Sequence, residues 1–125
     1  MNKVLAVGIA TIDIINELPF YPSEDSEHRV LNQRCVRGGN ACNLLSVLSQ
    51  LGYQCHWAWT IAEDVYYSKI INDLEHFKIN TDSIKCISNA INPVSYIIQS
   101  QKTASRSIVH YRDLKEYDFT DFKSI

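Results

Sequence analysis

The segment RGGNACN at residues 37–43 decides how the rest of the chain is interpreted. Two glycines stand directly before a run whose apolar residues recur at i, i+3, i+4 and i+7, namely Leu44, Val47, Leu48 and Leu51. This spacing is typical of one face of a helix, and Gly52 follows as a stop signal. We therefore predict a helix over 40–51, with Asn40 as its N-cap and the four apolar residues packed on a sheet.

The start of this predicted helix has a chemical use. A helix N-terminus leaves backbone N–H groups unpaired and carries a partial positive charge, and glycines before it let a ligand approach the main chain. Asn40 and Asn43 add amides that both donate and accept, which suits a polyhydroxyl ligand or an anion. The same spacing also fits an ordinary capped helix after a tight turn, and the residues alone leave both interpretations open.

The composition excludes several classes of protein. The 125 residues suffice for one modest domain, with 46% apolar and 21% charged residues. A net charge of −2 with scattered Lys and Arg gives no basic stripe for nucleic acid or an anionic membrane. No apolar run reaches transmembrane length, and the N-terminus opens into a strand-like run without a signal-peptide pattern. We expect a cytoplasmic protein that binds neither nucleic acid nor membrane.

The cysteines and histidines do not suggest a metal centre. The four cysteines form no C-x-x-C pair, and the four histidines lack metal-ligand spacing. Free thiols and no metal site are the expectation.

The order of the predicted elements indicates the fold class. Apolar runs at 4–9 and 55–61 read as buried strands, and they alternate with helical patterns at 40–51 and 65–77. In the second helix a common face gathers Ile70, Ile71, Leu74 and Phe77, which we assign to the core. The alternation predicts an α/β fold, a parallel sheet with flanking helices and right-handed crossovers.

Other strand-like segments have no clean apolar face. Residues 28–36 alternate with mixed polarity, which favours a strand outside the main core, as in a lid or a plain surface hairpin. Residues 94–99 and 106–111 are separated by a length that fits a hairpin. The pattern does not decide whether that hairpin joins the lid or extends the main sheet.

Asp13 stands out inside the apolar stretch 12–15. A buried carboxylate is costly unless it is hydrogen-bonded or paired, so a buried Asp13 would need a partner or a ligand. An aspartate at a turn or a strand edge that faces water is the other interpretation.

Four blocks of the chain, at 7–14, 21–29, 37–52 and 106–109, resemble the ribokinase-like, phosphofructokinase B-type carbohydrate kinases. The long irregular block YPSEDSEHR at 21–29 is most similar to the ketohexokinase (fructokinase) branch of that family. The resemblance implies a partial ribokinase-like fold with a core of about 1–12 and 37–90. It also implies β-lid strands at about 13–36, with 93–112 as a candidate addition. These strands would cover the sugar and can pair two subunits into a homodimer.

The resemblance also implies site residues. Asp13, Gly39, Asn40 and Asn43 match positions that bind the sugar, and Arg106 matches an arginine near the nucleotide phosphates. A solvated hairpin arginine is the other interpretation of Arg106. A full family member would use ATP and Mg²⁺ to phosphorylate a ketose, with fructose converted to its 1-phosphate.

The catalytic half of the family pattern is not in this sequence. In the family a Gly-Ala-Gly-Asp motif supplies the anion hole and the base, whereas here no glycine follows Gly52. We therefore assign no catalytic residue and no cofactor to this chain alone. We expect the N-terminal, sugar-binding fragment of a kinase; the alternative is a non-catalytic truncated binding or dimerisation module.

Overall fold

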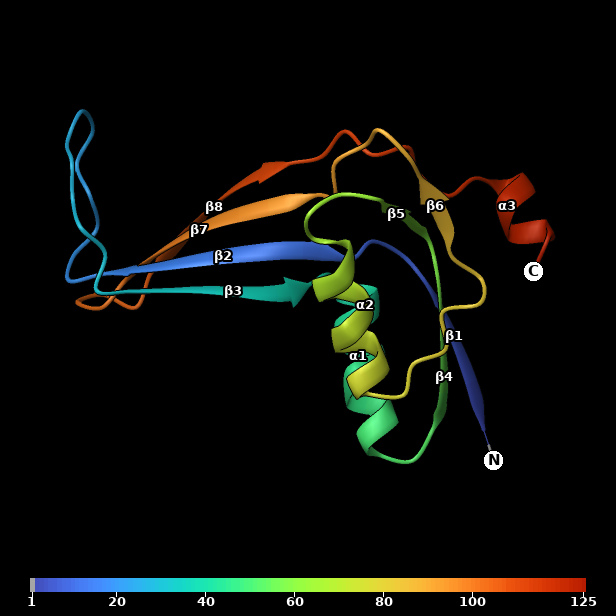
Figure 1. The fold of residues 1–125 in the computed structure, drawn as a ribbon. Coiled ribbons are helices and arrows are strands. Elements are labelled where there is room, and N and C mark those ends of the chain that lie inside the picture. Colours follow the sequence, from blue (N-terminus) through green and yellow to red (C-terminus); the bar gives the residue numbers. More distant parts are fainter. Residues whose placement is uncertain (1) are drawn as a thin grey trace.

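The computed structural model describes residues 2–125 as a helix-covered body from which a long sheet projects (Figure 1). The strands are β1 Lys3–Val7, β2 Thr11–Leu18, β3 Asn32–Gly38, β4 Gln54–Ala58, β5 Thr60–Ala62, β6 Lys85–Ile87, β7 Val94–Ser100 and β8 Arg106–Tyr111. The helices are α1 Asn40–Gln50, α2 Tyr67–His76 and α3 Phe119–Lys123.

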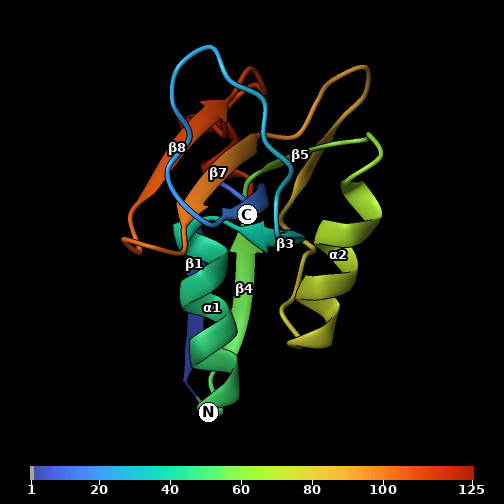
Figure 2. The same ribbon diagram turned by 90° about the vertical axis from the view of Figure 1, so that its left-hand side faces the viewer.

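The body has the predicted α/β organisation. Strands β1 and β4 pair in parallel, and β5 pairs in parallel with β6. The connection from β1 to β4 contains β2, β3 and α1. Figures 1 and 2 show α1 and α2 on the same side of β1 and β4. The predicted strand 55–61 is in fact two short strands, β4 and β5. Strand β6 was not predicted, because three residues of mixed burial give no periodic signal.

The projecting sheet has four strands in the order β3-β2-β7-β8. Strand β2 pairs antiparallel with β3 and parallel with β7, and β7 and β8 form an antiparallel hairpin. The hairpin that the sequence left unplaced therefore joins this sheet, which we call the lid sheet. Strand β3 begins at Asn32, later than the predicted 28, and its first five residues are exposed.

The core lies between the helices and the β1–β4 pair. Trp57 is fully buried, and its indole Nε1 donates a hydrogen bond to the Gly8 carbonyl oxygen at 2.7 Å. The largest polar-tipped side chain of the core is thus satisfied. Helix α2 buries Ile70 and Leu74 completely, and Ile71 and Phe77 pack against the same cluster at its rim. The predicted apolar face of this helix is the buried one.

The packing face predicted for α1 is largely wrong. Leu44, Val47 and Leu51 are 52%, 56% and 68% exposed, and only Leu48 of that set packs against the core. The buried residues of α1 are Cys42, Leu45 and Ser46.

A close approach between β1 and α1 explains this choice of face. A Cβ built on Gly8, the residue after β1, would lie only 2.9 Å from the Cβ of Ala41, so the helix and the end of the strand meet where both residues are small. Because α1 is apolar around much of its circumference, its periodicity alone selects no face.

No helix within residues 2–125 combines the length and the apolar character that a membrane crossing would need. The four cysteines are all free thiols.

Candidate functional site

A cavity of about 330 Å³ lies where the lid sheet meets the start of α1. It is lined by every site residue that the sequence suggested, namely Asp13, Gly39, Asn40, Asn43 and Arg106. These residues come from β2, from the start of α1 and from β8, so only the tertiary fold brings them together. Thr11 and Ser95 also line the cavity, and sequence reasoning did not identify them.

Asp13 is half-buried near the start of β2, a strand paired on both sides. Its Oδ1 accepts a hydrogen bond from the Thr11 hydroxyl at 2.8 Å. Gly38 leaves the space that the carboxylate occupies, since a Cβ there would stand 2.3 Å from Asp13 Oδ2. The carboxylate is thus held at the cavity, and Oδ2 has no side-chain donor among the described residues.

The turn into α1 depends on Gly39. This residue has a φ of 101°, and a Cβ on it would stand 2.2 Å from the Ile9 carbonyl oxygen. Both facts require glycine. Gly39 rather than Asn40 is the N-cap, and no side chain caps this helix within the described residues, which corrects the predicted role of Asn40. The side chains of Asn40 and Asn43 therefore remain at the cavity.

Asn43 has a partner that the sequence gave no reason to expect. Its Oδ1 accepts a hydrogen bond from Arg37 Nη1 at 2.7 Å. Arg37 also contacts Asp73 of α2, thirty-six positions away in the chain, and no local pattern predicts that contact.

Arg106 is exposed on β8 and reaches the rim of the cavity. Within residues 2–125 no carboxylate forms an ion pair with it. A guanidinium at the rim that has no carboxylate partner can bind an anion, because it presents donors and positive charge only.

Ser95 adds a hydroxyl group to the cavity. It lies beside Asp13 in the parallel register of β2 and β7, and its hydroxyl is hydrogen-bonded to His110 Nδ1 at 2.9 Å. A serine in a strand has no sequence signature for such a role.

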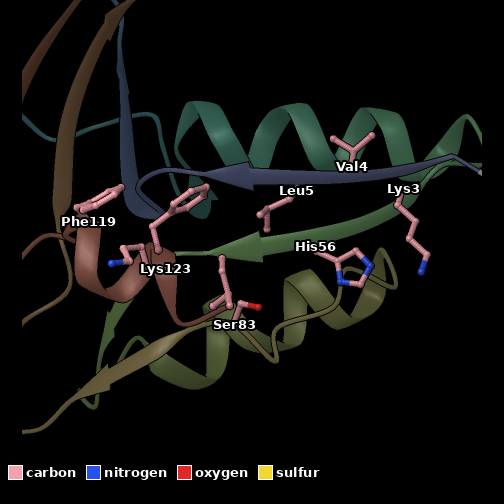
Figure 3. Close-up of a pocket in the computed structure, with 9 residues that line it drawn as sticks. Lys3, Val4, Leu5, His56, Ser83, Phe119 and Lys123 are labelled. Carbon is pink, nitrogen blue, oxygen red and sulfur yellow. The ribbon is translucent and has the colours of Figure 1, made fainter.

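A larger cavity, of about 580 Å³, lies between β1, β4 and α3 (Figure 3). Its walls are mainly apolar, with Leu5 and Phe119 among them. His56 also lines it, and its buried Nε2 has no hydrogen-bond partner among residues 2–125. No Asp, Glu or Asn side chain of the described residues lines it. The smaller cavity, which combines an acid, two amides and a guanidinium, is therefore the candidate site.

The described residues, 2–125, contain no group of three or more His, Cys, Asp or Glu side chains placed to hold a metal ion. The candidate site has one carboxylate, so its donors suit hydroxyl groups better than a hard cation.

Comparison with known proteins identifies a family. The profile of the pfkB family carbohydrate kinases matches residues 1–123. Ketohexokinase from Mus musculus is 33% identical over 133 residues, which cover 99% of this chain and 45% of that protein. The chain thus spans less than half the length of this curated relative.

Solved structures share the fold at lower identity. A putative ribokinase from Agrobacterium tumefaciens superposes with a TM-score of 0.81 at 21% identity, covering 90% of this chain and 36% of that one. Ribokinase from Arabidopsis thaliana, solved with ribose and ATP, gives a TM-score of 0.74 at 20% identity, covering 88% of this chain and 35% of that one.

Proposed function

Since the chain belongs to the pfkB family of carbohydrate kinases, we propose that it is the sugar-binding part of an ATP-dependent kinase that phosphorylates a ketose, with fructose as the substrate. The observation that carries this proposal is the convergence of Asp13, Asn40 and Asn43 on one cavity. The similarity to a ketohexokinase supports a ketose, and the match over less than half of that relative supports a sugar-binding part.

The chemistry of the cavity suits a sugar. A sugar hydroxyl both donates and accepts, and the Asp13 carboxylate offers an acceptor while the asparagine amides offer donors. The glycine at 39 lets a small ligand approach the backbone at the start of α1. Hydrogen bonds to a charged carboxylate are stronger than neutral ones, so Asp13 is expected to contribute most to affinity.

ATP would supply the phosphoryl group. Arg106 is the residue of this chain that we assign to its phosphates, because it is a cation without an acidic partner at the rim of the sugar cavity. The described residues form no donor set for Mg²⁺, and we derive no step through that ion.

The lid sheet is proposed as a homodimer contact. Strand β3 is an edge strand with exposed residues, and edge strands pair readily with other chains. The mass in solution, measured by light scattering at several concentrations, tests this. A monomer at all of them would count against the dimer.

In the central experiment the 125-residue chain is titrated with fructose, and calorimetry measures the binding. We expect saturable binding in the wild type and a loss of about tenfold to a hundredfold in affinity in Asp13→Asn, because a charged hydrogen bond contributes about 1.5–3 kcal/mol. Glu17→Gln is the matched control, since Glu17 lies on the same strand but outside the cavity. Equal affinity in Asp13→Asn and wild type would refute the site assignment.

The same chain, given fructose, ATP and Mg²⁺, should form no fructose phosphate, because it contains no glycine-rich anion hole after Gly52 and no assigned base. Product that disappears in Asp13→Asn would show that catalysis comes from residues not assigned here. Ribose, titrated in parallel, distinguishes a site for a ketohexose such as fructose from a site for an aldopentose.

A further inference from the structure

Arg37 is an almost completely buried arginine at the end of β3, with a side chain only 4% exposed. Its guanidinium donates three hydrogen bonds to residues of two helices, α1 and α2. Nε contacts Asp73 Oδ2 at 2.9 Å, Nη1 contacts Asn43 Oδ1 at 2.7 Å and Nη2 contacts Ser46 Oγ at 2.7 Å. A buried arginine with this many partners is held in one orientation.

The chemistry of the guanidinium determines which way the Asn43 amide faces. Arginine has donors only, so the amide must turn its oxygen toward Arg37. The NH₂ group of Asn43 is then directed away from Arg37 and remains available as a donor. Asn43 lines the candidate sugar cavity, whereas Arg37 does not.

We propose that Arg37 is a positioning residue that makes Asn43 a hydrogen-bond donor to the sugar, opposite the acceptor that Asp13 provides. This inference rests on the proposed sugar site. A polyol can then donate one hydroxyl to Asp13 and accept from Asn43 at another. A freely rotating Asn43 amide would present its oxygen to the cavity part of the time. Asn43 and Asp13 would then both be acceptors, and neither could donate a hydrogen bond to the sugar.

Two neighbours keep the guanidinium in place. Asp73 on α2 provides charge, and Ser46 on α1 accepts from Nη2 while its own hydroxyl donates to the Cys42 carbonyl oxygen at 2.9 Å. Each hydrogen bond from Arg37 through Ser46 to Cys42 therefore has one donor and one acceptor. Helix α2, which does not line the cavity, influences the site through Asp73 and Arg37.

A double-mutant cycle on fructose affinity tests the proposal. Arg37→Met should weaken binding about fivefold, the effect of one neutral hydrogen bond of about 1 kcal/mol. The same substitution in an Asn43→Ala background should cause no further loss, because Arg37 acts through Asn43. In an Asn40→Ala background the fivefold loss should persist, since Asn40 is not among the three hydrogen-bond partners of Arg37 in the described residues. Equal losses in the Asn43→Ala and Asn40→Ala backgrounds would overturn the proposal.

Arg37→Lys is the control that separates loss of positioning from simple unfolding in Arg37→Met. A lysine ammonium retains the charge beside Asp73 but cannot hold three partners with the fixed geometry of the guanidinium. We expect its melting temperature to stay closer to wild type than that of Arg37→Met, while fructose affinity falls to a similar extent. A lysine variant with full affinity would overturn the positioning role.

A measurement without sugar separates this inference from the proposed function. In NMR spectra of the free chain, the Asn43 side-chain NH₂ signals should be those of an ordered amide, with a high heteronuclear NOE. In Arg37→Met and Arg37→Lys they should become those of a mobile amide. Absence of fructose binding in the wild type would refute the sugar site alone. An Asn43 amide that stays ordered in both variants would refute the role of Arg37.

Discussion

Gly38 lies so close to Asp13 that a Cβ at position 38 would stand 2.3 Å from Asp13 Oδ2, and the three nearest atoms all belong to that carboxylate. The absence of a side chain at one position therefore determines where a carboxylate is held at the other. Gly38 does not have a positive φ, so the requirement comes from space and not from backbone conformation.

Gly38→Ala is expected to displace the Asp13 carboxylate from the cavity. Overpacking of this kind costs about 1–3 kcal/mol of stability, and fructose affinity should fall at least as far as in Asp13→Asn. Chemical denaturation and calorimetry measure the two effects. In an Asp13→Ala background the alanine at 38 should be tolerated, because the clashing atoms are gone. An equal stability cost in both backgrounds would contradict this explanation.

Asn92→Ala is expected to loosen the junction between β5 and β7. Asn92 is 1% exposed, its Oδ1 accepts from the Ala62 N–H at 2.9 Å, and its Nδ2 donates to the Ala62 carbonyl oxygen and to Asp64 Oδ1. Its loss leaves buried backbone groups of Ala62 without partners, at about 1–3 kcal/mol for each group. Urea denaturation should show a clear loss of stability, whereas Asn72→Ala on the exposed surface of α2 should show almost none.

The four thiols are expected to react in two classes. Cys35 and Cys86 are exposed, whereas Cys42 and Cys55 are buried. Burial raises the pKa of Cys42 to about 12, in spite of the opposing charge of Arg37. At pH 8 its thiolate fraction is then only about one in ten thousand. Iodoacetamide labelling followed by mass spectrometry should modify Cys35 and Cys86 first. Rapid labelling of Cys42 in the folded chain would contradict the packing of α1.

The attachment of α3 is expected to depend on pH. Lys85 Nζ lies 2.9 Å from Asp121 Oδ1. The backbone hydrogen bond from Asp118, followed by the bond from Lys85, lowers the pKa of Asp121, and the bond to Asp121 raises the pKa of Lys85. The stabilising effect of Asp121 is therefore present above its ordinary pKa of 3.8 and is lost as the pH falls through the lowered value. The stabilising effect of Lys85 is present below its ordinary pKa of 10.5 and is lost as the pH rises through the raised pKa.

Amide signals of residues 119–123, followed by NMR, should thus report an ordered α3 at neutral pH and a loosened one in strong acid. Asp121→Asn should remove much of the acid-induced change, and Asp113→Asn, in an exposed position, should leave it intact. Because the Lys85 side chain of this part-buried pair is 39% exposed, high salt should weaken the effect. The same acid response in Asp121→Asn and wild type would show that another group controls α3.

Local patterns in the sequence were sufficient for several of the elements, although β6 and α3 were not predicted. The helix that begins at Asn40, the parallel β1–α1–β4 unit and the hairpin of β7 and β8 all follow from patterns a few residues long. The family pattern named Asp13, Gly39, Asn40, Asn43 and Arg106, and the structure brings them to one cavity. Their roles toward a sugar and a nucleotide are proposals.

Contacts between distant segments needed the tertiary structure. Periodicity predicted the wrong packing face for α1, because two apolar stripes of this helix fit the pattern equally well. The close approach of Gly8 and Ala41 selects one of them. Strand β7 belongs to the lid sheet and not to the body, because it pairs with β2. The contacts of Arg37 with Asn43 and Asp73 join three elements.

By itself, then, the amino-acid sequence determined the α/β class, the position of the helix after the two glycines and the identity of the polar residues at its start. These depend on backbone propensity and on spacing within one or two turns. The tertiary structure alone decided which helix face is buried, which sheet each strand joins and how Asn43 is oriented. Those depend on packing volume and on hydrogen-bond partners contributed by segments far away in the chain.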